Sequence, residues 1–135
     1  MTNITFLPGR MAREYYDKLN PLFEHVIDDD TDVTLDAFWA EIETDVFQLW
    51  IVNNFESFIT TRIDVRHTGR IMWAAYMAGE NMPDWVEDAI LFLKGLGEKY
   101  NCKAVEFWGR NGYKRKFKHL FPPVRELRTL YRIDL

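Results

Sequence analysis

The sequence has a single cysteine, Cys102, which excludes an internal disulfide and a cysteine-rich metal site. No apolar run approaches the roughly 20 residues that cross a bilayer, and the first residues lack the charged and apolar blocks of a signal peptide. A lone thiol is typical of proteins that work in a reducing compartment. We therefore expect a soluble cytoplasmic protein with no membrane partner.

Motifs for metal binding and nucleophilic catalysis are also missing. His25, His67 and His119 stand far apart, without the short spacing of metal ligands, and no serine or cysteine nucleophile motif is present. The acidic run Asp28–Asp32 has carboxylates that a divalent ion could use, but it lacks the glycine and the final glutamate of a calcium-binding loop. We expect a solvated loop there and no metal site.

Aromatic residues, in contrast, are abundant, and charge is unevenly spread. Five Trp, six Tyr and ten Phe residues in 135 can build one packed domain, which we expect to span residues 1–135. Residues 1–56 carry 12 acidic and 3 basic side chains, whereas residues 101–135 carry 9 basic and 3 acidic ones. This asymmetry fits either two partner surfaces or a self-complementary charge distribution within one fold.

Hydrophobic periodicity predicts a mixed α/β domain. Apolar or alternating stretches predict strands at residues 4–7, 46–52, 58–67, 71–78, 103–108 and 128–135. Helical spacing predicts a helix from Arg10 that Pro21 either kinks or divides at a new N-cap, Asn20, and a second helix capped by Thr34. A third helix runs from Trp85 to about Tyr100, and a short one follows around residues 113–120.

The stretch 71–110 predicts one central unit of the fold, made of a strand, a short loop, a helix and a second strand. Asp84 and Glu87 have the spacing of a capping box for this helix, with Asp84 as the N-cap. If the helix is a right-handed crossover, the two strands that it joins are parallel. Gly95 and Gly97 each weaken the helix by about 1 kcal/mol relative to Ala, and we expect close packing or an early helix end there.

This order of elements resembles the GNAT acetyltransferase superfamily over almost the whole chain. The closing stretches Asn111-Gly112-Tyr113-Lys114-Arg115-Lys116-Phe117 and Leu130-Tyr131-Arg132 are similar to those of the small GNAT-like proteins of tailed phages. The resemblance implies a mostly antiparallel sheet whose fourth and fifth strands are parallel and splay apart to admit acetyl-CoA. It also implies that the cofactor pyrophosphate binds to backbone N–H groups at the start of the crossover helix, where the helix dipole favours an anion.

The resemblance implies cofactor contacts from the end of the fourth strand and from the segment after the fifth. The candidates at these positions are Met77, Ala78, Gly79 and Asn111. In the superfamily a tyrosine on the helix after the fifth strand acts as general acid toward the departing thiolate. Tyr113 is the candidate here, one turn before the family position near Lys116 or Phe117, and its alternative reading is a core tyrosine.

Two carboxylates are candidates for the general base. Glu80 ends the fourth predicted strand and Glu106 lies within the fifth. A carboxylate in mostly apolar surroundings is suited to base chemistry near neutral pH. The alternative readings are a helix-start anion for Glu80 and a side chain on a half-exposed face for Glu106.

The loop before the crossover helix departs from the phosphate-binding pattern of the superfamily. It has only Gly79, Pro83 removes an N–H donor, and four acidic residues oppose a pyrophosphate by like-charge repulsion, namely Glu80, Asp84, Glu87 and Asp88. We therefore predict a GNAT-like phage protein that has lost catalysis and acts as a protein-interaction or virion component, in the host cytoplasm or the virion. The alternative is an N-acetyltransferase that uses acetyl-CoA.

A basic segment near the end of the chain is the predicted partner-binding surface. It comprises Arg110, Lys114, Arg115, Lys118 and Arg125. Its expected partners are other protein chains, from phage or host or a second copy of this chain. Nucleic-acid binding through residues 110–128 is a further alternative, by phosphate contacts and stacking, but the overall charge of −4 opposes it.

Overall fold

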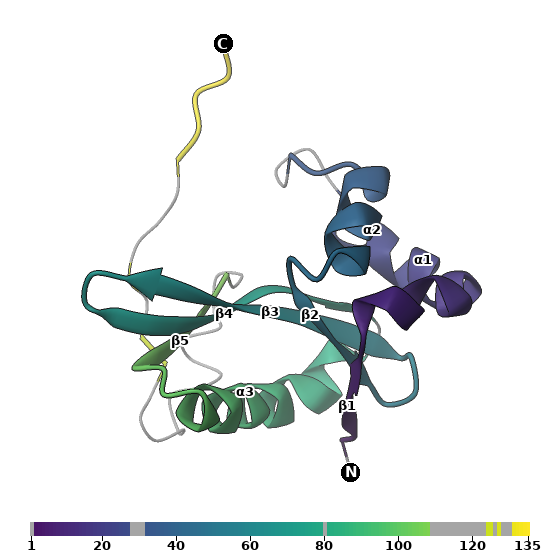
Figure 1. Cartoon of the computed structure of the whole chain (residues 1–135). Helices are drawn as coiled ribbons and strands as arrows, with labels where there is room; N and C mark the ends of the chain where they lie inside the picture. Colours follow the sequence, from purple (N-terminus) through teal and green to yellow (C-terminus); the bar gives the residue numbers. More distant parts are fainter. Residues whose placement is uncertain (1, 28–31, 80, 109–123, 126, 128–130) are drawn as a thin grey trace.

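The computed structural model describes residues 2–27, 32–79, 81–108, 124, 125, 127 and 131–135. Its elements are β1 (Ile4–Leu7), the 3-10 helix η1 (Gly9–Tyr15), α1 (Tyr16–Glu24), α2 (Leu35–Glu43), β2 (Gln48–Val52), β3 (Ser57–Arg66), β4 (Gly69–Gly79), α3 (Met82–Lys99) and β5 (Ala104–Phe107). The strands form one sheet in the order β1-β2-β3-β4-β5. Figure 1 shows η1, α1 and α2 on one face of this sheet and α3 on the other.

The strand directions confirm the predicted mixed α/β sheet. β1 to β4 pair antiparallel with their neighbours, while β4 and β5 pair parallel. The helix α3 joins the two parallel strands, as a crossover connection requires. The predicted parallel pair of fourth and fifth strands is therefore confirmed.

Each face of the sheet has its own hydrophobic core. The core under η1, α1 and α2 is rich in aromatic side chains, and Phe23 packs edge-on against Phe38 and Phe58 with ring centroids 4.8 and 5.0 Å apart. The core under α3 contains Trp85 together with smaller apolar side chains from β2, β3, β4 and α3. Aromatic burial at this density stabilises the placement of the helices on both faces.

A β-bulge divides β4 into two parts. Thr60 of β3 pairs with Tyr76, but Thr61 pairs with Ala74, so Ala75 has no opposite residue on β3. The Tyr76 N–H instead donates to the Thr60 hydroxyl at 3.1 Å. The bulge shifts the alternation of side chains, and Ala75 and Tyr76 both pack toward α1 and α2.

The predicted break at Pro21 is wrong. Pro21 lies inside α1, and the change of helix type occurs at Tyr15, where the 3-10 turns end. Asn20 is not an N-cap, because it lies inside α1. Its side chain accepts a hydrogen bond from the Trp39 indole N–H of α2 at 2.8 Å and donates to Glu24 of its own helix at 3.3 Å.

The N-cap predicted for α2 is confirmed. The Thr34 hydroxyl accepts a hydrogen bond from the Ala37 N–H at 3.1 Å. The acidic residues at the end of this helix, which oppose its dipole, have tertiary partners: Glu43 pairs with Arg13 of η1, and the Asp45 carboxylate accepts from the Gly9 N–H at 3.3 Å. These acids attach η1 to α2.

The predicted capping box of α3 is wrong. The helix begins at Met82, three residues before the predicted start, so Asp84 lies in the first turn and Asn81 is the N-cap, in a left-handed conformation and without a side-chain cap. Pro83 fits this early position because N–H groups in the first turn have no helical partner.

The glycines of α3 differ from each other. Gly97 is a close-packing point as predicted, since an added Cβ would lie 3.2 Å from a Val105 methyl carbon. Gly95 is exposed with nothing within 4 Å, and the helix continues to Lys99, so neither role expected of Gly95 is seen.

The predicted closing strand is also wrong for the residues that the structure describes. Residues 131–135 have no regular structure, and Tyr131 and Ile133 are 86% and 88% exposed. The acidic loop at 28–31 and residues 128–130 lie outside the described residues. The helices in the described ranges include none that is long and apolar enough to cross a membrane.

Candidate functional site

The most distinctive feature of the sheet is the point where β4 and β5 part. Their parallel register runs from Ile71 opposite Ala104 to Ala74 opposite Phe107. β4 continues for five more residues, Ala75–Gly79; in the described part of the chain, Tyr76–Gly79 pair only with β3 and the bulged Ala75 has no partner. Within the described ranges, no residue pairs with the other edge of this stretch. The predicted splay of the fourth and fifth strands is consistent with this geometry.

Three of the predicted cofactor contacts, Met77, Ala78 and Gly79, lie on this stretch of β4. Gly79 has a further, structural reason to be glycine. Its φ is +133°, and an added Cβ would lie 2.6 Å from the Cα of Ser57. Close approach of the two strand backbones requires glycine here, so Gly79 alone does not indicate a phosphate-binding loop.

The start of α3 carries negative charge next to the open edge of β4. Asp84 lies in the first turn, Glu87 and Asp88 follow, and all three are exposed. The Asp88 carboxylate accepts a hydrogen bond from the Thr2 hydroxyl at 2.6 Å. Carboxylates at this end are favourable for the helix dipole, but they repel a phosphate group in the same place.

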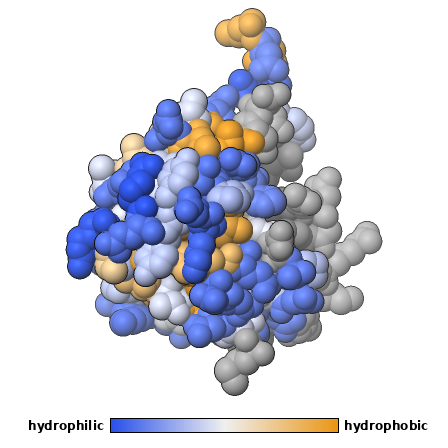
Figure 2. All heavy atoms as spheres, turned by 90° about the vertical axis from the view of Figure 1, so that its right-hand side faces the viewer, coloured by the Kyte–Doolittle hydropathy of each residue, from blue (hydrophilic) through white to orange (hydrophobic). Residues whose placement is uncertain are grey.

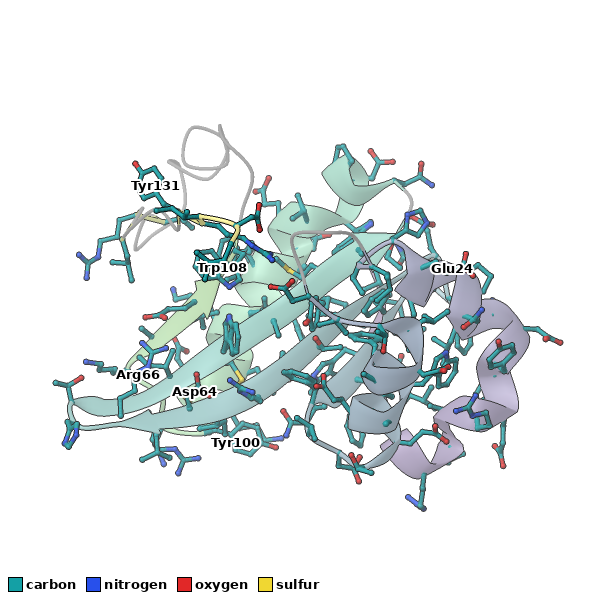
Figure 3. The ribbon with its side chains drawn as sticks, turned by 90° about the horizontal axis from the view of Figure 1, so that it is seen from above. Glu24, Asp64, Arg66, Tyr100, Trp108 and Tyr131 are labelled. Carbon is teal, nitrogen blue, oxygen red and sulfur yellow. The ribbon has the colours of Figure 1, made fainter. Side chains whose placement is uncertain are left out.

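One face of the sheet is closed at this point. Trp85, in the first turn of α3, is fully buried in the core that also contains Ala74 and Ala89. On the opposite face, Ala75, Tyr76 and Ala78 pack against the core under α1 and α2. Figure 3 looks down on that opposite face, with Asp64 and Arg66 on the β3–β4 hairpin and Trp108 just beyond the end of β5.

A network of charges covers this opposite face beside β5. The two carboxylate oxygens of Glu106 accept hydrogen bonds from the Arg66 guanidinium at 2.9 and 3.0 Å. Asp64 is 3.7 Å from Arg66 and 2.9 Å from Arg62, and the Arg62 guanidinium stacks over Trp73 at 4.5 Å from the ring centroid. The hydrogen bond to Glu106 raises the pKa of Arg66 above its usual value.

Glu106 thus lies on the face of the sheet opposite α3, among charged side chains. Its register partner on β4 is Trp73, and both of its oxygens are occupied by a guanidinium. To act as a base, this carboxylate would have to give up part of a bidentate ion pair, which is among the stronger polar contacts. Its role as general base stays a prediction.

Tyr76 is a site residue that the sequence analysis missed. It lies on the part of β4 beyond the bulge, on the face of the sheet opposite α3. Its ring packs edge-on against Phe38 and Phe47. Burial raises the pKa of the Tyr76 phenol above its usual value; Glu41 adds to this effect and Arg62 opposes it. The signal in the sequence was a hydroxyl within the otherwise apolar strand 71–78.

Most of the remaining predicted residues lie outside the described residues. They are Glu80, Arg110, Asn111, Tyr113, Lys114, Arg115 and Lys118. Arg125 is described and exposed. Within the described ranges, no group of three His, Cys, Asp or Glu side chains could hold a metal ion.

The fold is that of the GNAT N-acetyltransferases, as whole-chain comparison with solved structures shows. An acetyltransferase from Trypanosoma brucei matches with a TM-score of 0.69 at 9% identity, covering 100% of both chains. A ribosomal-protein-alanine N-acetyltransferase from Brucella melitensis biovar Abortus matches at 0.66 and 12% identity, again over 100% of both. An aminoglycoside N-acetyltransferase in complex with CoA matches at 0.64 and 10% identity, over 99% of this chain and 95% of that one.

At the level of sequence, neither a protein-family pattern nor a curated protein matches the chain. Identities of 9–12% to the three solved structures establish a shared fold. Activity has to be argued from the residues of this chain, because one fold hosts many functions.

Proposed function

We propose that this protein binds acetyl-CoA along the open edge of β4 and transfers its acetyl group to an amine. One observation carries the proposal: β5 leaves β4 after Ala74, and Ala75–Gly79 keep a strand edge without a described partner. An extended ligand with amide groups can pair with such an edge as an added strand does. Acetyl-CoA has two amides in its arm and, when bound, supplies the activated acetyl group.

The residues around this edge fit part of the cofactor better than the rest. Met77, Ala78 and Gly79 offer backbone groups to the arm, whereas Asp84 at the start of α3 opposes the pyrophosphate. The amine would approach from the face that α3 leaves open, where Tyr76 and Glu106 lie. Glu106, which lies on this face beside Arg66, could accept a proton from the amine.

A second candidate is a GNAT-shaped interaction protein without catalysis, with a phage or host protein as its partner. The acidic first turns of α3, Pro83 without an N–H, and the structural reason for Gly79 favour this candidate. This second candidate includes a phage origin, which the resemblance suggests, and a role in a virion. The two candidates differ in whether the chain transfers an acetyl group.

Calorimetry with acetyl-CoA on the full chain tests the proposal directly. Binding followed by release of CoA in the presence of amines supports the acetyltransferase, whereas no heat at millimolar ligand contradicts it. Binding without turnover over a broad set of amines leaves only the non-catalytic candidate. CoA release should be followed chromatographically, because Cys102 is a free thiol and would add to a thiol-reagent signal.

A charge variant with a matched control tests where the phosphates bind. Asp84→Asn removes a carboxylate from the first turn of α3, and Glu98→Gln removes an exposed one from the last turn of the same helix. We expect Asp84→Asn to tighten acetyl-CoA binding about two- to threefold at low salt, which is the size of a screened charge interaction at 5–10 Å. Glu98→Gln should leave the affinity unchanged. Equal affinities for both variants would place the phosphates elsewhere.

A further inference from the structure

β1 is an edge strand with an exposed aromatic side chain. Its four residues pair with β2 on one side, and the described part of the chain offers no partner on the other. Phe6 is 47% exposed, and its ring centroid lies 5.3 Å from that of Trp50. An edge with free N–H and C=O groups beside apolar surface is a place where another strand can add.

The segment 131–135 has the pattern of a strand but no sheet to join. Tyr131 and Ile133 are 86% and 88% exposed, Leu135 is fully exposed, and the charged Arg132 and Asp134 alternate with them. Every second side chain is therefore apolar, as on a strand with one buried face. Arg132 holds the segment by an ion pair with Asp32 at 3.0 Å, while the apolar side chains remain in solvent.

The two features lie on opposite sides of the same molecule. In Figure 1 the segment rises above the left half of the sheet, whereas β1 lies at the right and extends below it. Figure 2, which views the molecule from the side of β1, shows the segment projecting above the body with hydrophobic residues at its end. The segment therefore lies away from β1 of its own chain.

The apolar side chains of the two features are complementary. On β1, Ile4 and Phe6 belong to the face that carries Trp50 and α3, whereas Leu7 belongs to the other core. An added strand with its apolar side chains on the Phe6 face would extend that apolar row and leave its charged side chains on the opposite face.

We propose that the segment Tyr131–Leu135 of one chain adds as a strand to β1 of a second copy. The contact gives the unpaired edge a partner and buries the exposed apolar side chains of both.

Sedimentation of the full chain from micromolar to several hundred micromolar concentration tests this inference. We expect a concentration-dependent species of twice the chain mass or more. Deletion of residues 131–135, or Phe6→Lys on the edge strand, should each shift the dissociation constant at least tenfold toward monomer. Val65→Ser is the matched control, because Val65 is 81% exposed at the hairpin and outside both features; it should change nothing.

A mixing experiment distinguishes the proposed contact from any other. The deleted chain keeps an intact β1, and the Phe6→Lys chain keeps an intact segment, so each alone should be monomeric while an equimolar mixture forms a heterodimer. A full chain that stays monomeric at all concentrations overturns the proposal. So does an association that survives the deletion, or a mixture that fails to associate. Circular dichroism on each variant confirms that the fold is retained.

Discussion

The two glycines of α3 allow a matched test of how tightly this helix packs on the sheet. Gly95→Ala and Gly97→Ala make the same chemical change two residues apart. In a helix interior, alanine is favoured over glycine by about 1 kcal/mol. At Gly95 nothing lies within 4 Å of the new methyl group, so we expect nearly the whole gain.

At Gly97 the same methyl group meets a neighbour. It would lie 3.2 Å from a Val105 methyl carbon on β5, 3.7 Å from Cβ of Met72 and 3.8 Å from Cβ of Cys102. Overpacking of a filled site typically costs about 1–3 kcal/mol, which offsets or exceeds the helix gain. We expect Gly97→Ala to be neutral or destabilising, so the two variants should differ by about 1–3 kcal/mol.

Urea denaturation followed by tryptophan fluorescence measures both variants under one set of conditions. A gain of about 1 kcal/mol at Gly95 corresponds to a rise in Tm of about 3–5 °C for a domain of this size. Val105→Ala should relieve the contact, so Gly97→Ala should become stabilising in that background, with a coupling of at least about 0.5 kcal/mol. If Gly97→Ala stabilises the wild-type chain as much as Gly95→Ala does, α3 does not pack against β5 as described.

Two further predictions concern the other face of the sheet. Gly9→Ala should destabilise by about 2–3 kcal/mol in the same assay, because the new Cβ would overlap the Ile42 carbonyl oxygen and lie 2.6 Å from the Asp45 carboxylate; a stability equal to wild type would contradict the packing of η1 on α2. Tyr76→Phe should flatten the alkaline limb of the stability profile. Burial raises the pKa of Tyr76 in the folded chain, so the unfolded chain loses this proton first, and stability should fall as pH rises above about 10. Denaturation midpoints between pH 8 and 11 that run parallel for both proteins would show that Tyr76 makes no such contribution.

Local signals explain which parts of the fold could be predicted from the sequence. Thr34 caps α2 through its own hydroxyl, three residues from the N–H that it binds, and the 71–78 and 103–108 stretches were apolar enough to mark β4 and β5. The start of α3 was missed because Asp84 fits a capping pattern, whereas the helix actually begins after Asn81 in a left-handed conformation. The pattern at Asn20-Pro21 also suggested a helix start, but Asn20 lies inside α1 and its side chain accepts a tertiary hydrogen bond from Trp39.

The candidate site depended on contacts between distant residues. Arg66 and Glu106 are 40 residues apart, and neither position alone indicates a bidentate ion pair. The open edge of β4 depends on where β5 ends, which hydrophobicity does not show, because Phe107 and Trp108 are both aromatic and only the first is in the strand. Met77, Ala78 and Gly79 were placed at this edge through the family resemblance, and their contact with a cofactor stays a prediction.

The bulge at Ala75 has a consequence for how related sequences should be aligned. Ala74 and Met77 pack in the core under α3, whereas Ala75, Tyr76 and Ala78 pack on the other side of the sheet. Even-numbered residues therefore face α3 up to Ala74, and odd-numbered residues face it beyond the bulge. A relative that lacks the bulge would have one residue fewer in this strand. An alignment without a gap at this position would compare inward-facing residues with outward-facing ones throughout the candidate site. Distant relatives should therefore be aligned in two blocks that meet at Ala75.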